Sequence, residues 1–144
     1  MNAIRKWLYI GKYRDTLDPA YLAVRKIGAV LQLAEPIQYR DIESLYLPVE
    51  DGFPLGNYYL RQGIDFVLNQ KKLRRNVLVA CGSGMSRSAA FVVAILIENE
   101  GLGLLEALRV VKSHHPDTMI HPTLWKSLCV VYREDIPFER VLVT

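Results

Sequence analysis

Cys81 and Arg87 are the residues whose types and spacing most directly indicate chemistry. Five residues separate them, from Gly82 to Ser86, and two of the five are glycines. A thiolate is a nucleophile, and the planar guanidinium of an arginine binds two oxygens of an oxyanion at once. The pair therefore predicts a nucleophile beside a bound oxyanion, both held by a short loop.

The segments that flank this loop strengthen the interpretation. Val77 to Ala80 is an apolar run typical of a strand buried on both faces, and a nearly all-apolar helix is expected from about Arg87 to Glu98. A loop between such a strand and helix directs backbone N–H groups and the positive helix end at one point, which suits a dianionic phosphate. The ordinary alternative is a buried structural cysteine. The expected phosphate-binding residues are Gly82, Ser83, Gly84, Met85, Ser86 and Arg87.

The bulk composition predicts one domain over residues 1–144, in a soluble, cytoplasmic and monomeric protein. The net charge is +3 without a dominant Lys/Arg run, so no nucleic-acid partner is expected. Two cysteines are too few for a secreted disulfide scaffold. The longest apolar run, Ala89 to Ile97, is short of the roughly 20 residues that span a bilayer, so no membrane partner is expected.

Strand-like and helix-like segments alternate along the chain, which predicts an α/β domain. A loop over 48–56 carries two prolines and two glycines. In the tail after Glu134, residues 140–144 are interpreted as an extra strand. Strands are expected at 7–10, 29–33, 44–47 and 77–80, and helices at 18–28, 59–75, 87–98, 104–114 and 122–133.

The loop region resembles the signature of the protein tyrosine phosphatase superfamily, specifically its small, atypical dual-specificity branch. Gly84-Met85-Ser86-Arg87-Ser88 matches the G-x-S-R-S of that branch. The resemblance runs from about Trp7 to Leu128, and it implies a central, mostly parallel sheet flanked by helices and a reaction without metal or other cofactor. Similar segments are Leu8 to Gly11, Ile27 to Leu31 and Ala94 to Ile97.

Asp51 is the expected general acid. It lies thirty residues before Cys81 on a loop of the kind that carries the acid in this family, and Glu50 is the alternative. A carboxylic acid at this point would protonate the leaving oxygen of a phosphomonoester. Without the resemblance, both carboxylates would be interpreted as ordinary loop residues, with Asp51-Gly52 as a turn.

The resemblance implies a two-step mechanism. The Cys81 thiolate attacks phosphorus while Asp51 protonates the leaving group, and water activated by Asp51 then hydrolyses the cysteinyl-phosphate. Arg87 and the loop N–H groups would hold the equatorial oxygens. Ser88 would donate a hydrogen bond to the sulfur, or satisfy a free N–H at the helix start.

Two positions depart from the family pattern. Ala80 replaces the histidine that usually precedes the cysteine, and Ile120-His121 stands where a Pro-Asn pair is usual. His114, His115 and His121 lack a metal-ligand spacing, so they are interpreted as surface or loop residues.

Two further features have ordinary explanations. Cys129 is interpreted as core filler, with a resolving thiol for oxidised Cys81 as the alternative. The basic run Lys71 to Arg75 is interpreted as a helix C-terminus, where cations suit the helix dipole. A docking patch for acidic partners is the alternative.

The expected activity is dephosphorylation of phosphotyrosine and phosphoserine or phosphothreonine in proteins, with phosphate or vanadate as site ligands. The loop interior has no lysine, which disfavours highly phosphorylated inositol lipids. RNA 5′-phosphates, nucleotides and phosphoinositides remain alternatives, as do a non-catalytic phosphate-binding module and a sulfurtransferase or arsenate-reductase-like enzyme.

Overall fold

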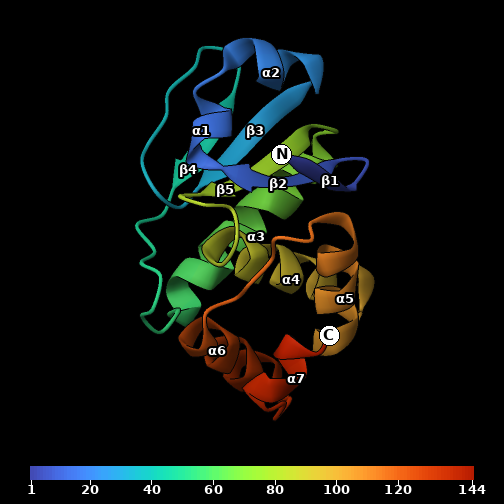
Figure 1. Ribbon diagram of the computed structural model, residues 1–144. Coiled ribbons are helices and arrows are strands. Elements are labelled where there is room, and N and C mark those ends of the chain that lie inside the picture. Colours follow the sequence, from blue (N-terminus) through green and yellow to red (C-terminus); the bar gives the residue numbers. More distant parts are fainter.

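A five-stranded sheet with the order β1-β2-β5-β3-β4 runs through the middle of the molecule (Figure 1). The computed structural model describes residues 1–144. Strands β2, β5, β3 and β4 are parallel, and β1 joins β2 in an antiparallel pair. The sheet is thus mostly parallel, as predicted. The strands are β1 (Asn2–Arg5), β2 (Leu8–Lys12), β3 (Ile27–Gln32), β4 (Glu43–Tyr46) and β5 (Asn76–Cys81).

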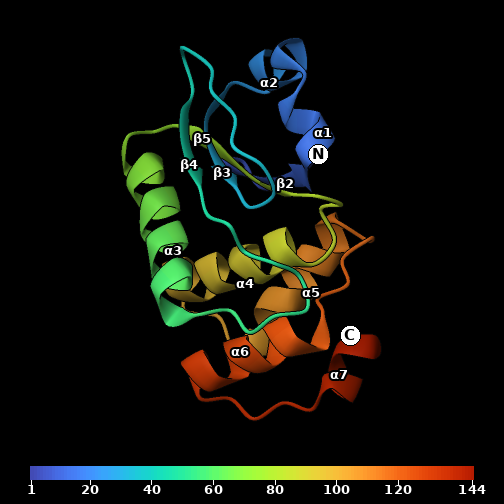
Figure 2. The same ribbon diagram turned by 90° about the vertical axis from the view of Figure 1, so that its left-hand side faces the viewer.

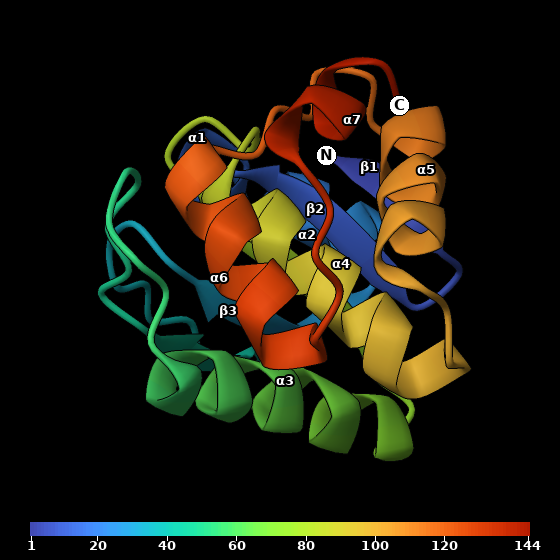
Figure 3. The ribbon, with the colours of Figure 1, turned by 90° about the horizontal axis from the view of Figure 1, so that it is seen from below.

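Helices cover both faces of the sheet unequally (Figure 2). The short α1 and α2 lie on one face, and α3, α4 and α5 lie on the other. Helices α6 and α7 lie beyond α4, farther from the sheet (Figure 3). No helix combines the length and the apolar character needed to cross a bilayer. The helices are α1 (Tyr13–Thr16), α2 (Pro19–Val24), α3 (Asn57–Lys72), α4 (Arg87–Glu100), α5 (Leu104–His114), α6 (Pro122–Tyr132) and α7 (Phe138–Leu142).

The main core lies between the sheet and the larger helical layer, and α4 is at its centre. Every residue from Ser88 to Leu96 is buried, as expected for a helix that is apolar on all sides. A smaller apolar cluster on the other face joins α2 to β3 and β5 through Leu22, Val30 and Ala80. Residues 82–86, the predicted phosphate loop, leave the sheet between these two cores.

The predicted strand at 140–144 is wrong, because the tail forms α7. Its Val141 is buried, and the Trp125 indole N–H donates to the carbonyl of Ile136 at 2.9 Å just before this helix. In this helix Phe138 and Val141, three residues apart, lie on one face. Helix α2 also ends earlier than predicted, at Val24. Strands and helices missed by the pattern are β1 and α1, both of four residues.

Candidate active site

Residues 82–86 form a tight loop between the carboxyl end of β5 and the start of α4. Gly84 adopts a positive φ of 75°, and a Cβ at this position would lie 2.8 Å from the carbonyl oxygen of Gly11 in β2. A side chain would therefore be strained by its own backbone and would also collide with the neighbouring strand. The glycine is what allows the loop to curl against the sheet edge.

Cys81 lies at the base of the loop and is 1% exposed. Its sulfur is 3.2 Å from the hydroxyl oxygen of Ser88, and the backbone N–H of Ser88 donates to the same sulfur at 3.4 Å. Both contacts come from the first turn of α4, where the helix dipole is positive. The surroundings of the sulfur therefore suit a negative charge.

Arg87 folds its side chain back over the loop. Its Nη1 donates to the carbonyl of Val49 at 3.0 Å and to that of Leu33 at 3.3 Å. Its Nη2 lies against Gly82, 2.9 Å from where a Cβ would stand. Two hydrogen bonds therefore fix the guanidinium, one to the end of β3 and one to the loop that carries the predicted acid.

Asp51 is tied to the phosphate loop through Ser86. The Ser86 hydroxyl donates to Oδ1 of Asp51 at 2.7 Å and accepts from the backbone N–H of His121 at 2.9 Å. Glu50 is exposed and makes no comparable side-chain contact with the loop. Of the two predicted candidates, the structure thus brings Asp51 to the loop.

His115 is a site residue that the sequence did not reveal. His115 lies in the loop after α5, as predicted, but it is not a surface residue, because it is only 8% exposed. Its Nε2 donates to the carbonyl of Gly84 at 2.8 Å, and its Nδ1 is 2.8 Å from the amide oxygen of Asn2. The ring thus braces the phosphate loop against β1. His114, by contrast, is exposed, as predicted.

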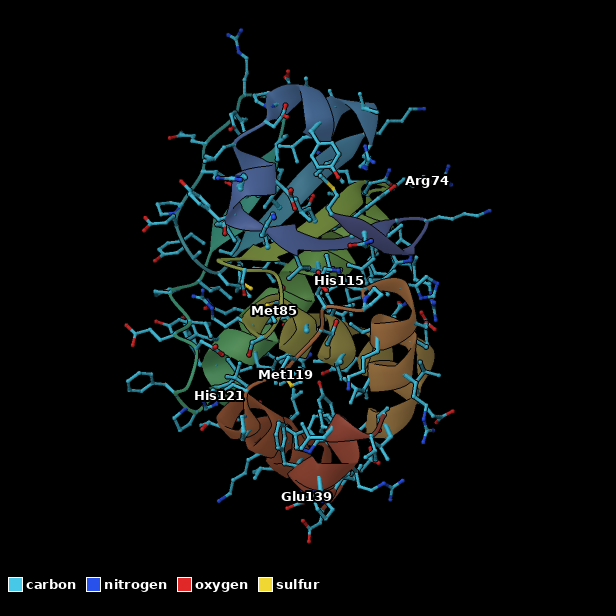
Figure 4. All side chains as sticks on the ribbon, in the orientation of Figure 1. Arg74, Met85, His115, Met119, His121 and Glu139 are labelled. Carbon is cyan, nitrogen blue, oxygen red and sulfur yellow. The ribbon has the colours of Figure 1, made fainter.

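A second brace comes from the segment before α6. The backbone N–H of Met119 donates to the carbonyl of Met85 at 2.9 Å. Figure 4 shows Met85, Met119 and His121 near one another at the site. These residues line a cavity of about 380 Å³ together with Asp51, Ser83, Ser86, Ile120, Pro122 and Phe138.

Ala80, the departure from the family pattern, is fully buried and packs in the smaller core with Leu22 and Val30. Successive residues of a strand point to opposite faces, so Ala80 and Cys81 belong to different sides of the sheet. Alanine in place of the usual histidine therefore packs in an apolar core, and the contacts between the Cys81 sulfur and Ser88 do not involve it.

Cys129 lies on α6, with its sulfur 3.6 Å from the carbonyl oxygen of Ile136. Both cysteines are free thiols. Burial raises the pKa of the Cys129 thiol, and the carboxylates of Asp135 and Glu134 add to the effect. These surroundings fit a packing residue.

The match to a known catalytic domain decides the family. The family described as "Dual specificity phosphatase, catalytic domain" matches residues 8–134. The chain belongs to the dual specificity phosphatase family. The predicted resemblance is thereby confirmed for most of the length of the chain.

Individual dual specificity phosphatases are similar to this chain in sequence. Dual specificity protein phosphatase 15 of mouse is 30% identical over 120 residues, which are 81% of this chain and 51% of the mouse protein. Dual specificity protein phosphatase 22-B of zebrafish is 32% identical over 121 residues, which are 81% of this chain and 65% of the zebrafish protein. The chain spans about half the length of the first of these relatives.

Solved structures agree in fold. The crystal structure of DUSP15 has a TM-score of 0.82 at 27% identity and covers 88% of this chain and 83% of its own. The crystal structure of human DUSP28 has a TM-score of 0.86 at 23% identity and covers 92% of this chain and 96% of its own. The predicted α/β fold of the dual specificity phosphatases is therefore confirmed.

Proposed function

We propose that this chain hydrolyses phosphomonoesters through a cysteinyl-phosphate intermediate, acting on phosphotyrosine and phosphoserine or phosphothreonine in proteins. The proposal rests on one observation, which is that a thiol, a guanidinium and a carboxylate lie around the same loop. The Cys81 sulfur lies at the base of the loop, the Arg87 guanidinium folds over it, and the Asp51 carboxylate is hydrogen-bonded to Ser86 at its rim.

The first step forms a bond between sulfur and phosphorus. The Cys81 thiolate attacks in line, the bond from phosphorus to the ester oxygen breaks, and Asp51 in its acid form gives its proton to that oxygen. Arg87 and the loop N–H groups hold the three equatorial oxygens while charge redistributes among them. The products of this step are an alcohol or phenol and the cysteinyl-phosphate.

The second step releases phosphate and restores the enzyme. A water oxygen attacks phosphorus, one of its protons passes to the Asp51 carboxylate, and the thiolate leaves. The Ser88 hydroxyl, 3.2 Å from the sulfur, donates to the thiolate as it forms. Neither step requires a metal ion, so the reaction proceeds in the presence of EDTA.

Two observations favour proteins as substrates. The relatives that match most of this chain are named dual specificity protein phosphatases. In addition, the cavity beside Asp51 is partly apolar, and its wall includes the exposed Met85 and Met119, which offer apolar contacts to the polypeptide that carries the phosphoryl group.

Turnover of p-nitrophenyl phosphate tests the proposal. The wild-type protein, Cys81→Ser and Asp51→Asn are compared in EDTA, with Glu50→Gln as the matched control on the same loop. We expect no turnover by Cys81→Ser, a loss of about 100-fold or more for Asp51→Asn, and little change for Glu50→Gln. A wild-type protein that binds vanadate without turnover would instead make the loop a phosphate-binding module. Strict Mg²⁺ dependence would contradict the mechanism.

A further inference from the structure

The amino ends of three neighbouring strands form one edge of the molecule, opposite the phosphate loop. Strands β2, β5 and β3 lie side by side and run parallel, so their starts meet at this edge. Figure 1 shows these starts on the right of the sheet, away from the loop that follows β5. Each strand is preceded by a pair of basic residues, and the pairs are Arg5-Lys6, Arg25-Lys26 and Arg74-Arg75.

Direct contacts hold the three turns together. The side-chain amide of Asn76 donates to the carbonyl of Arg25 at 3.1 Å, which joins the turn before β5 to the turn before β3. The backbone N–H of Val77 donates to the carbonyl of Trp7 at 2.7 Å, and the Lys71 ammonium lies 4.9 Å from the centre of the Trp7 ring. Three separate parts of the sequence thus make one continuous surface.

Most cations on this surface lack a carboxylate partner, although Arg25 lies 4.3 Å from the centre of the Tyr21 ring and Arg75 donates to Oε1 of Gln70 at 2.7 Å. Arg5 forms an ion pair with Glu100 and holds the pKa of that carboxyl below its usual value through hydrogen bonds. No other basic residue of the edge has a carboxylate within 4.0 Å. Two apolar side chains project among these cations, because Val24 is 75% exposed and Leu73 is 60% exposed. The amino-edge surface is defined as Lys6, Val24, Arg25, Lys26, Lys72, Leu73, Arg74 and Arg75.

The backbone places two of these cations at strained positions. Lys26 and Arg74 adopt φ values of 55° and 61°, each one residue after the C-cap of a helix. Glycine is the usual residue at this left-handed position, and another residue there costs on the order of 1 kcal/mol. Arg133 at the C-cap of α6 has the same left-handed conformation, so a cation at this position suits the helix dipole in general, and two of the three such cations lie on this edge. Figure 4 shows Arg74 pointing outward, on a different side from Met85.

We propose that the amino-edge surface binds the surface of an anionic lipid bilayer. Unpaired cations on a rigid edge are attracted to acidic headgroups by about 1 kcal/mol each. Val24 and Leu73 extend among these cations, where they would enter the boundary between headgroups and acyl chains. The exposed apolar side chains favour a bilayer as the partner, because binding of an acidic protein would require only the positive charges. The sequence predicted no membrane partner because no apolar run is long enough to span a bilayer, but binding to a bilayer surface needs no such run.

Binding by this edge would hold the phosphate loop away from the lipid. A strand rises about 3.3 Å per residue, so Cys81 lies about 16 Å beyond Asn76, on the side that faces the aqueous phase. The bound protein would therefore act on soluble phosphoproteins near the membrane and would not reach the headgroups beneath it. The proposal does not depend on catalysis, because none of the residues of the amino-edge surface belongs to the phosphate loop.

Vesicle co-sedimentation tests the proposal. The wild-type protein is mixed with vesicles of phosphatidylcholine alone or of phosphatidylserine and phosphatidylcholine in equal parts, at roughly 0.1 M salt. We expect binding only to the vesicles that contain phosphatidylserine. The double variant Lys26→Gly/Arg74→Gly should bind about 25-fold more weakly, since each lost cation weakens binding about fivefold. Glycine suits both left-handed positions, so the thermal stability of this variant should not fall.

Two further variants make the result specific. Arg109→Gln/Arg140→Gln removes the same charge from exposed positions on α5 and α7, outside the amino-edge surface, and its vesicle binding should match the wild type within about twofold. Leu73→Ser should weaken binding about fivefold while leaving the charge unchanged. Absence of wild-type binding, or equal binding by the Lys26→Gly/Arg74→Gly variant, would overturn the proposal. Binding to polyglutamate is measured in the same way. If the protein binds polyglutamate, if Leu73→Ser does not change that binding, and if vesicles do not compete with it, the surface binds an acidic protein instead.

Discussion

At the scale of single residues, the site combines a local motif with distant supports. Cys81, Arg87 and Ser88 fall within eight consecutive residues, so their arrangement follows from one strand, loop and helix and could be predicted from the sequence. Asp51 was predictable only through the resemblance, because nothing in its own loop marks it as an acid. His115 was not predictable, since its partner Asn2 is 113 positions away and neither residue carries a motif.

We predict that His115 positions the phosphate loop. His115→Leu leaves the carbonyl of Gly84 without its donor, which costs about 1–3 kcal/mol for a buried group. The expected result is a rise in KM for p-nitrophenyl phosphate and weaker inhibition by phosphate, with a smaller change in kcat. His115→Gln retains an N–H donor of similar reach and should restore much of the phosphate affinity. Equal losses in both variants, with KM unchanged, would show that the ring serves packing alone.

We predict that Cys129 is unreactive at neutral pH. Burial raises the pKa of its thiol, so the thiolate fraction stays small until the pH exceeds the ordinary range for cysteine. Mass spectrometry of the protein after brief treatment with iodoacetamide at neutral pH should find Cys129 unmodified, and its modification should increase as the pH is raised. Rapid modification of Cys129 at neutral pH would contradict the packing role and revive the resolving thiol.

At the scale of secondary-structure elements, apolar patterning predicted the elements that pack against the core. The strand before the loop and the helix after it lie where the sequence placed them, because both are apolar on every side. The tail was harder to predict. Its few apolar residues fit a strand or a helix, and the choice is made by packing on α6, which is a tertiary contact.

The contact between α3 and α4 supplies an element-scale prediction. A Cβ added at Gly63 would lie 2.4 Å from Cε1 of the buried Phe91, so the helices approach too closely for a side chain. Alanine is favoured over glycine in a helix by about 1 kcal/mol, whereas overpacking of a core costs about 1–3 kcal/mol. Gly63→Ala should therefore lower the free energy of unfolding by up to about 2 kcal/mol.

Urea denaturation measures that change, with an exposed α3 position as the control. Asn69→Ala on the same helix adds helix propensity without a core contact, so it should leave stability unchanged or raise it slightly. If Gly63→Ala were as stable as the wild type, the helices would have room to separate, and the close approach would not be required by the fold.

At the scale of the whole molecule, the sheet separates two surfaces. The carboxyl ends of its parallel strands carry the phosphate loop, and the amino ends carry the basic turns. The sequence predicted the first surface, because a contiguous motif encodes it. It did not predict the second, because three basic pairs far apart in the chain converge only when β2, β5 and β3 become neighbours.

Detection of the covalent intermediate tests the central claim most directly. Asp51→Asn is mixed with p-nitrophenyl phosphate and quenched in acid, because loss of the base for the second step should let the cysteinyl-phosphate accumulate. Mass spectrometry of the digested protein should then find a phosphoryl group on Cys81, absent from Cys129 and from the Cys81→Ser protein. Release of p-nitrophenol by the wild-type protein with no phosphoryl group on Cys81 in any quenched sample would contradict the account.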